Sequence, residues 1–230
     1  MEEILTTNQG TIEWLNSRLG RLTASRFGDL LTQPKSKKDK EAGIVSQTTR
    51  SYLIEKLSEV LTGTSREFNN DGMDWGTQNE QEAREFYEFR NIAEVKQTGF
   101  IVLKENPMVG CSPDGLIGED GTLEIKCPYN TNNMVEYMFD GPVPNDYYAQ
   151  IQGGLWVLDR KWCDFVVYDP RIKNEELRMH IRRIQRDEAF IETLKKAVEF
   201  SLNYYEAMLK RVGLSFEDIL NDKHEAQDQS

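Results

Sequence analysis

The pattern of apolar and polar positions predicts helices before and after a central run of strands. Helices are expected at 11–19, 24–32, 47–62, 78–91, 131–139, 146–158 and 187–212. Strands, bounded by turn residues, are expected at 98–104, 107–117, 122–127, 162–168 and 176–184. This order indicates an α/β fold with a central mixed β-sheet flanked by helices.

One stretch, "MVGCSPDGLIGEDGTLEIKCP" at 108–128, places charged residues within predicted strands. In "TLEIKCP", Leu123 and Ile125 share one face and Glu124 and Lys126 share the other, because strand side chains alternate. "GEDG" supplies the Gly and Asp of a tight turn, so the two strands should pair antiparallel. With the turn centred on 119–120, Asp114 falls nearly opposite Glu124, where facing side chains lie about 5 Å apart.

Two carboxylates at that spacing repel each other unless one is protonated or a cation lies between them. Mg²⁺ is the natural cation, since one or two carboxylates, waters and phosphate oxygens hold it. Lys126 would then face an attacking water or a phosphate. The alternative is a solvated strand face in which Glu124, Lys126 and Asp114 form ordinary surface ion pairs, which are common.

The order proline, Asp114, a turn, Glu124, one apolar residue and Lys126 is the PD-(D/E)xK nuclease signature. Further blocks lie on either side of it: "RLGRLTASRF", "WGTQNEQEAREFYE", "CSPDGL", "LEIKCP", "YYAQIQGGLWV" and "YDPRI". They follow one another as in the lambda exonuclease (YqaJ-like viral recombinase) family. The chain resembles this family from about residue 14 to about residue 214.

The resemblance implies a restriction-endonuclease-like core and a magnesium-dependent exonuclease that degrades one strand of linear duplex DNA from its 5′ end. Such an enzyme leaves mononucleotides and 3′ single-stranded overhangs for phage-type recombination by strand annealing. The resemblance also implies two Mg²⁺ ions per active site, with Mn²⁺ as a substitute. Its implied partners are DNA ends with a 5′ phosphate, a homotrimeric ring and a single-strand annealing protein. Its implied location is the cytoplasm of a bacterial host, with a phage or prophage gene.

Glu80 can be distinguished from its acidic neighbours by helical spacing. Glu80, Ala83 and Tyr87 share one face of the predicted helix, which is the apolar side. A carboxylate turned inward is costly unless it is paired or binds metal. Thr77 and Glu80 also satisfy a capping box, which is the alternative role. The resemblance favours the metal role, because this glutamate matches the family's helix acid.

The metal site implied by the family uses Asp114, Glu124, Glu80 and the carbonyl of Ile125. Lys126 would orient or help to deprotonate the attacking water. Two ions about 4 Å apart would stabilise the attacking and the leaving oxygen.

Further residues match the family outside the metal site. Gln150 matches a glutamine near the reaction centre, with an ordinary helix-surface amide as the alternative. Arg18, Ser25 and Ser112 match its phosphate pocket, where Arg18 can donate bidentate hydrogen bonds and Ser25 lies near a helix N-terminus. Met73, in the polar stretch "NNDGMDW", either wedges between bases at a duplex end or folds back onto the core.

The formal net charge of −11 is unexpected for a protein that contacts phosphates. Charge distribution matters more than the sum, and "PKSKKDK" at 34–40 holds four lysines. Lys35, Lys37 and Lys38 are candidates for gripping phosphates, within a polar basic loop at 33–46. A solvated loop is the alternative.

Length and composition favour one compact nuclease domain at 1–220 with a polar tail at 221–230. There is no apolar run of about 18 residues, so no membrane span is expected. Three cysteines without a CxxC pair predict neither disulfides nor an iron–sulfur cluster.

Two rival functions stay open. A magnesium-dependent endonuclease would share Asp114, Glu124 and Lys126, and a non-catalytic DNA-end-binding protein could keep the fold without the chemistry. Closed circular duplex separates these classes, because only an endonuclease cuts it.

Overall fold

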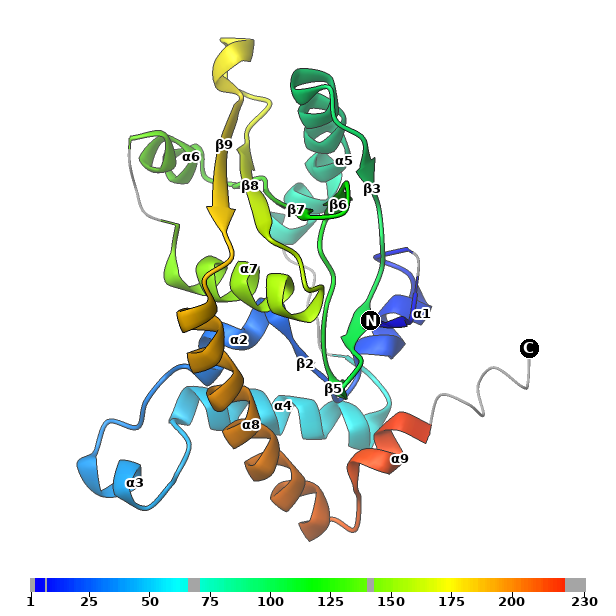
Figure 1. The fold of residues 1–230 in the computed structure, drawn as a ribbon, viewed down its shortest axis with the longest axis vertical. Helices are drawn as coiled ribbons and strands as arrows, with labels where there is room; N and C mark the ends of the chain where they lie inside the picture. Colours follow the sequence, from blue (N-terminus) through cyan, green and yellow to red (C-terminus); the bar gives the residue numbers. More distant parts are fainter. Residues whose placement is uncertain (1–2, 7, 66–70, 140–142, 222–230) are drawn as a thin grey trace.

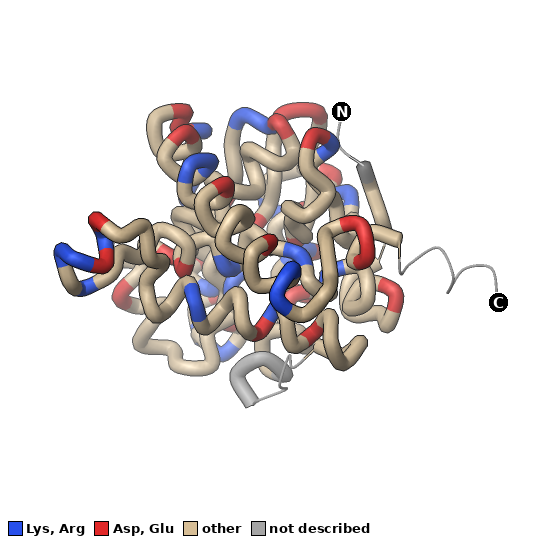
Figure 2. Tube along the Cα trace, turned by 90° about the horizontal axis from the view of Figure 1, so that it is seen from below, with Lys and Arg blue, Asp and Glu red and all other residues tan. Residues whose placement is uncertain are grey.

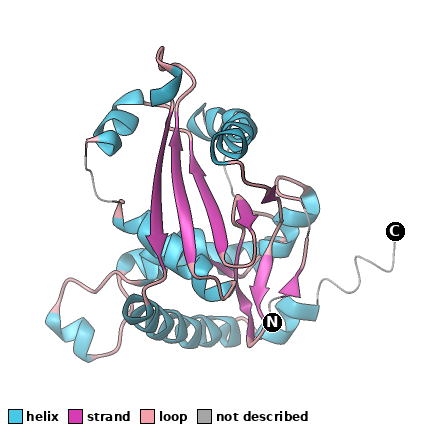
Figure 3. Ribbon diagram, turned by 45° about the horizontal axis from the view of Figure 1, so that its top comes forward, coloured by secondary structure: helices cyan, strands magenta, loops and turns pink. Residues whose placement is uncertain are grey.

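The chain forms two β-sheets with helices packed on their faces (Figures 1 and 3). The computed structural model describes residues 3–6, 8–65, 71–139 and 143–221, and for 71–74 only the backbone. The predicted α/β class is confirmed. The strands are divided between two sheets, whereas one central sheet was expected.

The smaller sheet has the order β1-β4-β5-β2, with parallel pairing only between β2 and β5. Its strands are β1 (Glu3–Ile4), β4 (Ile101–Leu103), β5 (Asn106–Cys111) and β2 (Leu22–Thr23). The larger sheet has the order β3-β6-β7-β8-β9. Its strands are β3 (Val95–Lys96), β6 (Gly115–Ile117), β7 (Gly121–Lys126), β8 (Trp162–Tyr168) and β9 (Met179–Gln185).

Helices cover the sheets and carry several of the candidate residues. They are α1 (Ile12–Arg18), α2 (Phe27–Leu30), α3 (Lys37–Glu41), α4 (Gln47–Thr62), α5 (Asp71–Asn91), α6 (Thr131–Met138), α7 (Asn145–Val157), α8 (Glu188–Arg211) and α9 (Phe216–Asn221). Two 3₁₀ turns, η1 (Ala24–Arg26) and η2 (Glu175–Leu177), complete the described elements. In the described part of the chain, no helix is long and apolar enough to cross a membrane.

The larger sheet is covered on both faces, and the alternation of its strands decides which residues face which helix. Leu123 and Ile125 of β7 are buried in the cluster that includes Ala83 and Tyr87 of α5. Residues of β8 alternate, so that Val166 lies in this cluster while its neighbours contribute to a second one with α6 and α7. Glu124 and Lys126 are therefore on the face of β7 opposite α5, as their spacing predicts.

β7 and β8 pair in parallel, and the chain between them passes through α6 and α7. Parallel neighbours need such a long crossover. It brings α7 beside the end of β7, where the charged residues lie. Below this sheet, α2, α4, α8 and α9 enclose the largest core cluster together with β4 and β5 (Figure 1).

The predicted strand at 107–117 is broken into β5 and β6, which belong to different sheets. Pro113 lies in the break, and a proline has no N–H to donate to a ladder. Gln9 donates a hydrogen bond to the Pro113 carbonyl at 2.8 Å. Residues 112–114 thus cross from one sheet to the other.

Several helix boundaries also differ from the prediction. Helix α5 begins at Asp71 and not at 78, although Gly72 and Gly76 disfavour a helix there. Within the predicted loop at 33–46, α3 forms with Ser36 as its N-cap, since the Asp39 N–H donates to the Ser36 hydroxyl at 3.0 Å. All three cysteines are free.

Candidate active site

The hairpin of β6 and β7 positions the two central carboxylates. Its pairs are Gly115 with Leu123, Leu116 with Thr122 and Ile117 with Gly121. The same antiparallel register, continued by one residue, places Asp114 opposite Glu124. This is the pairing that was predicted from the position of the turn. The Asp114 carboxylate accepts a hydrogen bond from the Ile125 N–H at 2.6 Å.

Glu124 connects β7 to α7. It is 6% exposed and accepts hydrogen bonds from the Lys126 ammonium at 2.6 Å and from the Gln150 amide at 2.5 Å. Gln150 therefore lies at the charged cluster and is not a simple surface amide. Both hydrogen bonds end on the same carboxylate oxygen, Oε1. The buried carboxylate therefore keeps acceptor capacity for another ligand.

Glu80 approaches the same place from α5. Its side chain is 33% exposed and pairs with Arg84 at 2.5 Å, and Arg84 also donates to the Asp114 carbonyl at 3.2 Å. The predicted helix face is found, since Ala83 and Tyr87 are buried. The capping-box alternative is wrong, because Thr77 lies inside a helix that begins at Asp71. Arg84 was not among the predicted site residues, although its i,i+4 spacing from Glu80 is a detectable signal.

Burial and mutual repulsion dominate the electrostatics of this cluster. Burial, followed by the charge of Asp114, raises the pKa of Glu80 to about 7. Burial likewise raises the pKa of Glu124 to about 7, against the opposing charge of Lys126. The pKa of Asp114 is also raised by burial. Burial alone would lower the pKa of Lys126, but Glu124 and Asp114 outweigh it and raise that pKa, so Lys126 stays protonated.

One cavity of about 390 Å³ joins these groups to the predicted phosphate pocket. Its lining includes all three carboxylates, Lys126 and Gln150, and on another wall Arg18, Ser25 and Ser112. The Trp14 indole N–H donates to the Ser112 hydroxyl at 2.9 Å, and the Arg18 guanidinium lies 4.1 Å from the centre of the Trp14 ring. The structure thus brings together residues from α1, η1, α5, β7 and α7.

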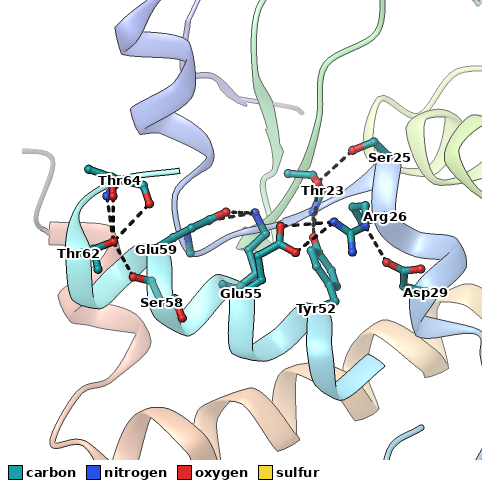
Figure 4. A network of polar contacts seen from close by, with 12 residues as sticks. Thr23, Ser25, Arg26, Asp29, Tyr52, Glu55, Ser58, Glu59, Thr62 and Thr64 are labelled. Carbon is teal, nitrogen blue, oxygen red and sulfur yellow. Dashed lines mark hydrogen bonds and ion pairs between the residues drawn. The ribbon is translucent and has the colours of Figure 1, made fainter. Parts of the chain in front are cut away.

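Side chains of helix α4 reach the segment that carries Thr23 and Ser25, next to the cavity (Figure 4). The Tyr52 hydroxyl accepts from the Thr23 N–H at 3.0 Å, and the Thr23 hydroxyl lies 3.2 Å from that of Ser25. Thr23 is at the N-cap position of η1, but its side chain makes no capping bond. Glu59 accepts from the Gly20 N–H at 3.0 Å, just after Arg18.

The sequence block "RLGRLTASRF" contains Arg18, Arg21 and Arg26, and two of these arginines serve the fold. Arg21 is buried and donates to the Pro107 carbonyl at 2.8 Å. Arg26 pairs with Asp29 at 2.6 Å and with Glu55 at 3.4 Å (Figure 4). Arg18 is the arginine of this group that lines the cavity.

Among the described residues, no three His, Cys, Asp or Glu side chains are arranged closely enough to hold a metal ion. The carboxylates turn instead to Lys126, Gln150, Arg84 and a backbone N–H. Their chemistry nevertheless suits a hard divalent cation, because three oxygen donors with raised pKa values repel one another around one cavity. The residue types present therefore fit a magnesium site.

Residues 13–161 match the YqaJ-like viral recombinase domain. The chain belongs to this family. It is similar to an alkaline exonuclease (LHK-Exo) from Laribacter hongkongensis, with a TM-score of 0.74 and 32% identity over 96% of this chain and 100% of that one. The structure of LHK-Exo in complex with dAMP gives a TM-score of 0.76 and 33% identity at the same coverage. An uncharacterized protein of Acanthamoeba polyphaga mimivirus is 26% identical over 178 residues, 72% of this chain, and the chain spans 30% of its length.

Membership in the YqaJ-like family confirms the resemblance drawn from the six sequence blocks. Together with the likeness to an alkaline exonuclease, it identifies the chain as a nuclease of a recombination family with a PD-(D/E)xK-type fold. Nucleases of this type typically need divalent metal ions. The family also implies a DNA substrate.

Other candidate residues of this YqaJ-like chain lie outside the cavity. Lys35, Lys37 and Lys38 are exposed on and before α3, which projects from one end of the molecule (Figures 1 and 2). Lys37 pairs loosely with Glu41 at 3.7 Å. Their contact with phosphates stays a prediction. The side chain of Met73 lies outside the described residues.

Proposed function

We propose that the chain is a magnesium-dependent exonuclease that degrades one strand of linear duplex DNA in the 5′→3′ direction. Its products are mononucleotides and 3′ single-stranded overhangs. The observation that supports this proposal is the shared cavity, which Arg18, Ser25 and Ser112 line together with the carboxylates and Lys126; we refer to the part with these three residues as the anion-binding wall. Strand direction requires recognition of a chain end, because a phosphodiester looks similar from either side.

The residues have separate roles in phosphodiester hydrolysis. Asp114, Glu124 and Glu80, with the Ile125 carbonyl, would hold two Mg²⁺ ions, or Mn²⁺ in their place. When bound, these ions supply charge stabilisation for the attacking and the leaving oxygen. Lys126, held at 2.6 Å from Glu124, donates a hydrogen bond that orients the attacking water or a phosphate oxygen.

Gln150 and the anion-binding wall position the DNA strand. Gln150 fixes the orientation of the Glu124 carboxylate from α7. Arg18, Ser25 and Ser112 bind the terminal 5′ phosphate, with charge-assisted hydrogen bonds from the guanidinium. The 5′-terminal nucleotide then lies inside the cavity, and the next phosphodiester lies at the carboxylates.

The cellular setting follows from the family as part of this proposal. A nuclease domain at 1–220 would assemble as a homotrimeric ring around DNA and act with a single-strand annealing protein. A ring with a basic channel would reconcile the net charge of −11 with DNA binding. Its place would be the cytoplasm of a bacterium that carries the phage or prophage gene.

The proposal is tested with one plasmid in two forms. In Mg²⁺, the linearised duplex is expected to be degraded while the covalently closed circle stays intact, and a chelator is expected to stop the reaction. Cutting of the circle would identify an endonuclease. A protein that binds linear ends and degrades neither form would be an end-binding protein, and either result would contradict the proposal.

Arg18→Ala is expected to remove most of the preference for 5′-phosphorylated ends over 5′-hydroxyl ends. The lost charge-assisted bonds should cost roughly 1.5–3 kcal/mol, on the order of tenfold to a hundredfold in rate. The measurement is the initial rate on the two matched duplexes. Arg50→Ala, at an exposed position of α4, is the control and should keep the preference. Equal rates of the unmutated protein on both ends would rule out the phosphate pocket.

A further inference from the structure

A second cavity, of about 990 Å³, shares a wall with the first. Glu80, Asp114 and Lys126 line both cavities. These charged residues thus lie between the two cavities. If the 5′ end of a DNA strand occupies the first cavity, the rest of that strand has to extend away from it, and the second cavity is next to the shared residues. The second cavity extends over α6 and the start of α7.

Three tyrosines are among the described residues that line the second cavity, whereas the described lining of the first contains none. Tyr129 is 58% exposed and Tyr147 is 36% exposed, while Tyr137 and Phe165 line the cavity as buried residues. The charged groups that it does not share with the first cavity are the acids Glu136 and Asp146; Lys126 is the one basic residue in its described lining. Such a surface repels phosphates and suits a flat, neutral ring.

Tyr129 is held in place from behind although its ring is exposed. Arg171, in the block "YDPRI", donates to the carbonyls of Tyr129 at 2.9 Å and Pro128 at 3.0 Å. The buried Asp169 fixes Arg171 at 2.8 Å. The Trp75 ring meets Tyr129 edge-on at 6.3 Å and carries the Arg171 guanidinium 4.4 Å from its centre.

Tyr147 links the tyrosine cavity to the reaction centre. The Lys126 ammonium lies 5.1 Å from the centre of the Tyr147 ring, and that ring packs tilted on Phe165 at 5.6 Å. A base that stacks beside Tyr147 would therefore be separated from Lys126 only by the Tyr147 ring. A pre-ordered aromatic surface loses little conformational entropy when a base binds to it.

We propose that this cavity binds the base of the second nucleotide, on the 3′ side of the scissile phosphate, stacked on Tyr129 and beside Tyr147. The inference rests on the proposed function, which places the first nucleotide in the other cavity. Arg171 is a positioning residue that holds the loop with Tyr129. Stacking on an aromatic ring accepts every base, as a non-specific exonuclease requires.

The substrates of the test are 5′-phosphorylated linear duplexes. The quantity measured is the rate at which the first nucleotide is released in Mg²⁺. An abasic residue at the second position is expected to lower kcat/KM of the unmutated protein by roughly tenfold, because a stacked base contributes this much on such platforms. An abasic residue in the complementary strand, opposite the second nucleotide, breaks the same base pair but keeps the stacking base. It is expected to have little effect.

The variants connect this loss to Tyr129. Tyr129→Ala should lower kcat/KM on the intact duplex about as much as the abasic residue does, and the abasic residue should then cause no further loss. Tyr129→Phe should behave as the unmutated protein, since it keeps the ring. Phe89→Ala, at an exposed aromatic residue of α5 outside the cavity, is the matched control.

The outcomes separate the two proposals. If the unmutated protein digests the phosphorylated duplex but responds equally to both abasic positions, the base-stacking site is wrong and the exonuclease assignment stands. If Tyr129→Ala lowers kcat/KM by the same factor on intact and on abasic DNA, relative to the unmutated protein, the ring and the base act independently. That result would also overturn the site. A protein that does not digest linear duplex at all would overturn both. The comparison of abasic substrates needs no variant, so misfolding of Tyr129→Ala leaves it decisive.

Discussion

Lys126→Ala is expected to lower turnover on linear duplex DNA by about 10²–10⁴-fold, the usual contribution of a residue that manages a proton in the transition state. The variant loses the hydrogen bond donor beside Glu124, while the carboxylates proposed to hold the metal remain. Binding to duplex ends should therefore be largely kept. The measurements are single-turnover cleavage in Mg²⁺ and end binding in Ca²⁺, which binds carboxylates but positions water poorly.

A matched control is Lys161→Ala, at an exposed lysine that pairs with Asp120 in the turn of the hairpin. It removes a surface ion pair from the same hairpin and should leave cleavage unchanged. Near-normal turnover of Lys126→Ala would contradict the assigned role of this lysine. Loss of end binding in the same variant would mean that its main effect is on DNA affinity.

Glu59→Gln is expected to destabilise the protein by about 3–5 kcal/mol, because it leaves the buried ammonium of Lys56 without its counter-charge. Lys56 and Glu59 are buried and 2.9 Å apart, and Glu59 also accepts from the Gly20 N–H. Glutamine keeps that acceptor, so the loss isolates the charge. The measurement is the free energy of unfolding from urea denaturation.

The double variant Lys56→Met with Glu59→Gln should recover most of this stability, since no unpaired charge is then buried. Glu206→Gln is the control, because Glu206 forms an exposed i,i+4 pair with Lys210 on α8 at 3.0 Å. Its cost should stay below about 1 kcal/mol. A double variant no more stable than Glu59→Gln would show that the ion pair is not the source of the effect.

The parts of the site that follow a local period were predictable from the sequence. The hairpin turn fixes which residues face each other, so Asp114 opposite Glu124 follows from counting. The helical period likewise placed Glu80 on the face of Ala83 and Tyr87. The long helix α8, Glu188–Arg211, lies within one residue of the prediction at each end, because its apolar stripe covers the main core.

The remaining differences come from contacts between distant residues. Strand β2 has only two residues, Leu22–Thr23, and exists because it pairs with β5. Two residues are too few for an alternation of apolar and polar positions to be recognised in the sequence. The first turns of α5 form against propensity, and Trp75 there contacts Tyr129 and Arg171, which the sequence places far away. The sequence block "RLGRLTASRF" also does not reveal which of its arginines is buried: Arg21 donates to the Pro107 carbonyl.

The crossing at Pro113 has a consequence for the length of the product. Ser112 and Asp114 flank this proline and line the same cavity, so two residues of chain join the wall proposed to bind the terminal phosphate to the carboxylates proposed to act on the next one. Pro113 has a locked φ angle, and its carbonyl is held by Gln9. Under the proposed function, this rigid stretch of backbone would set the spacing between the two phosphates, and each cut would advance the strand by the same single-nucleotide step.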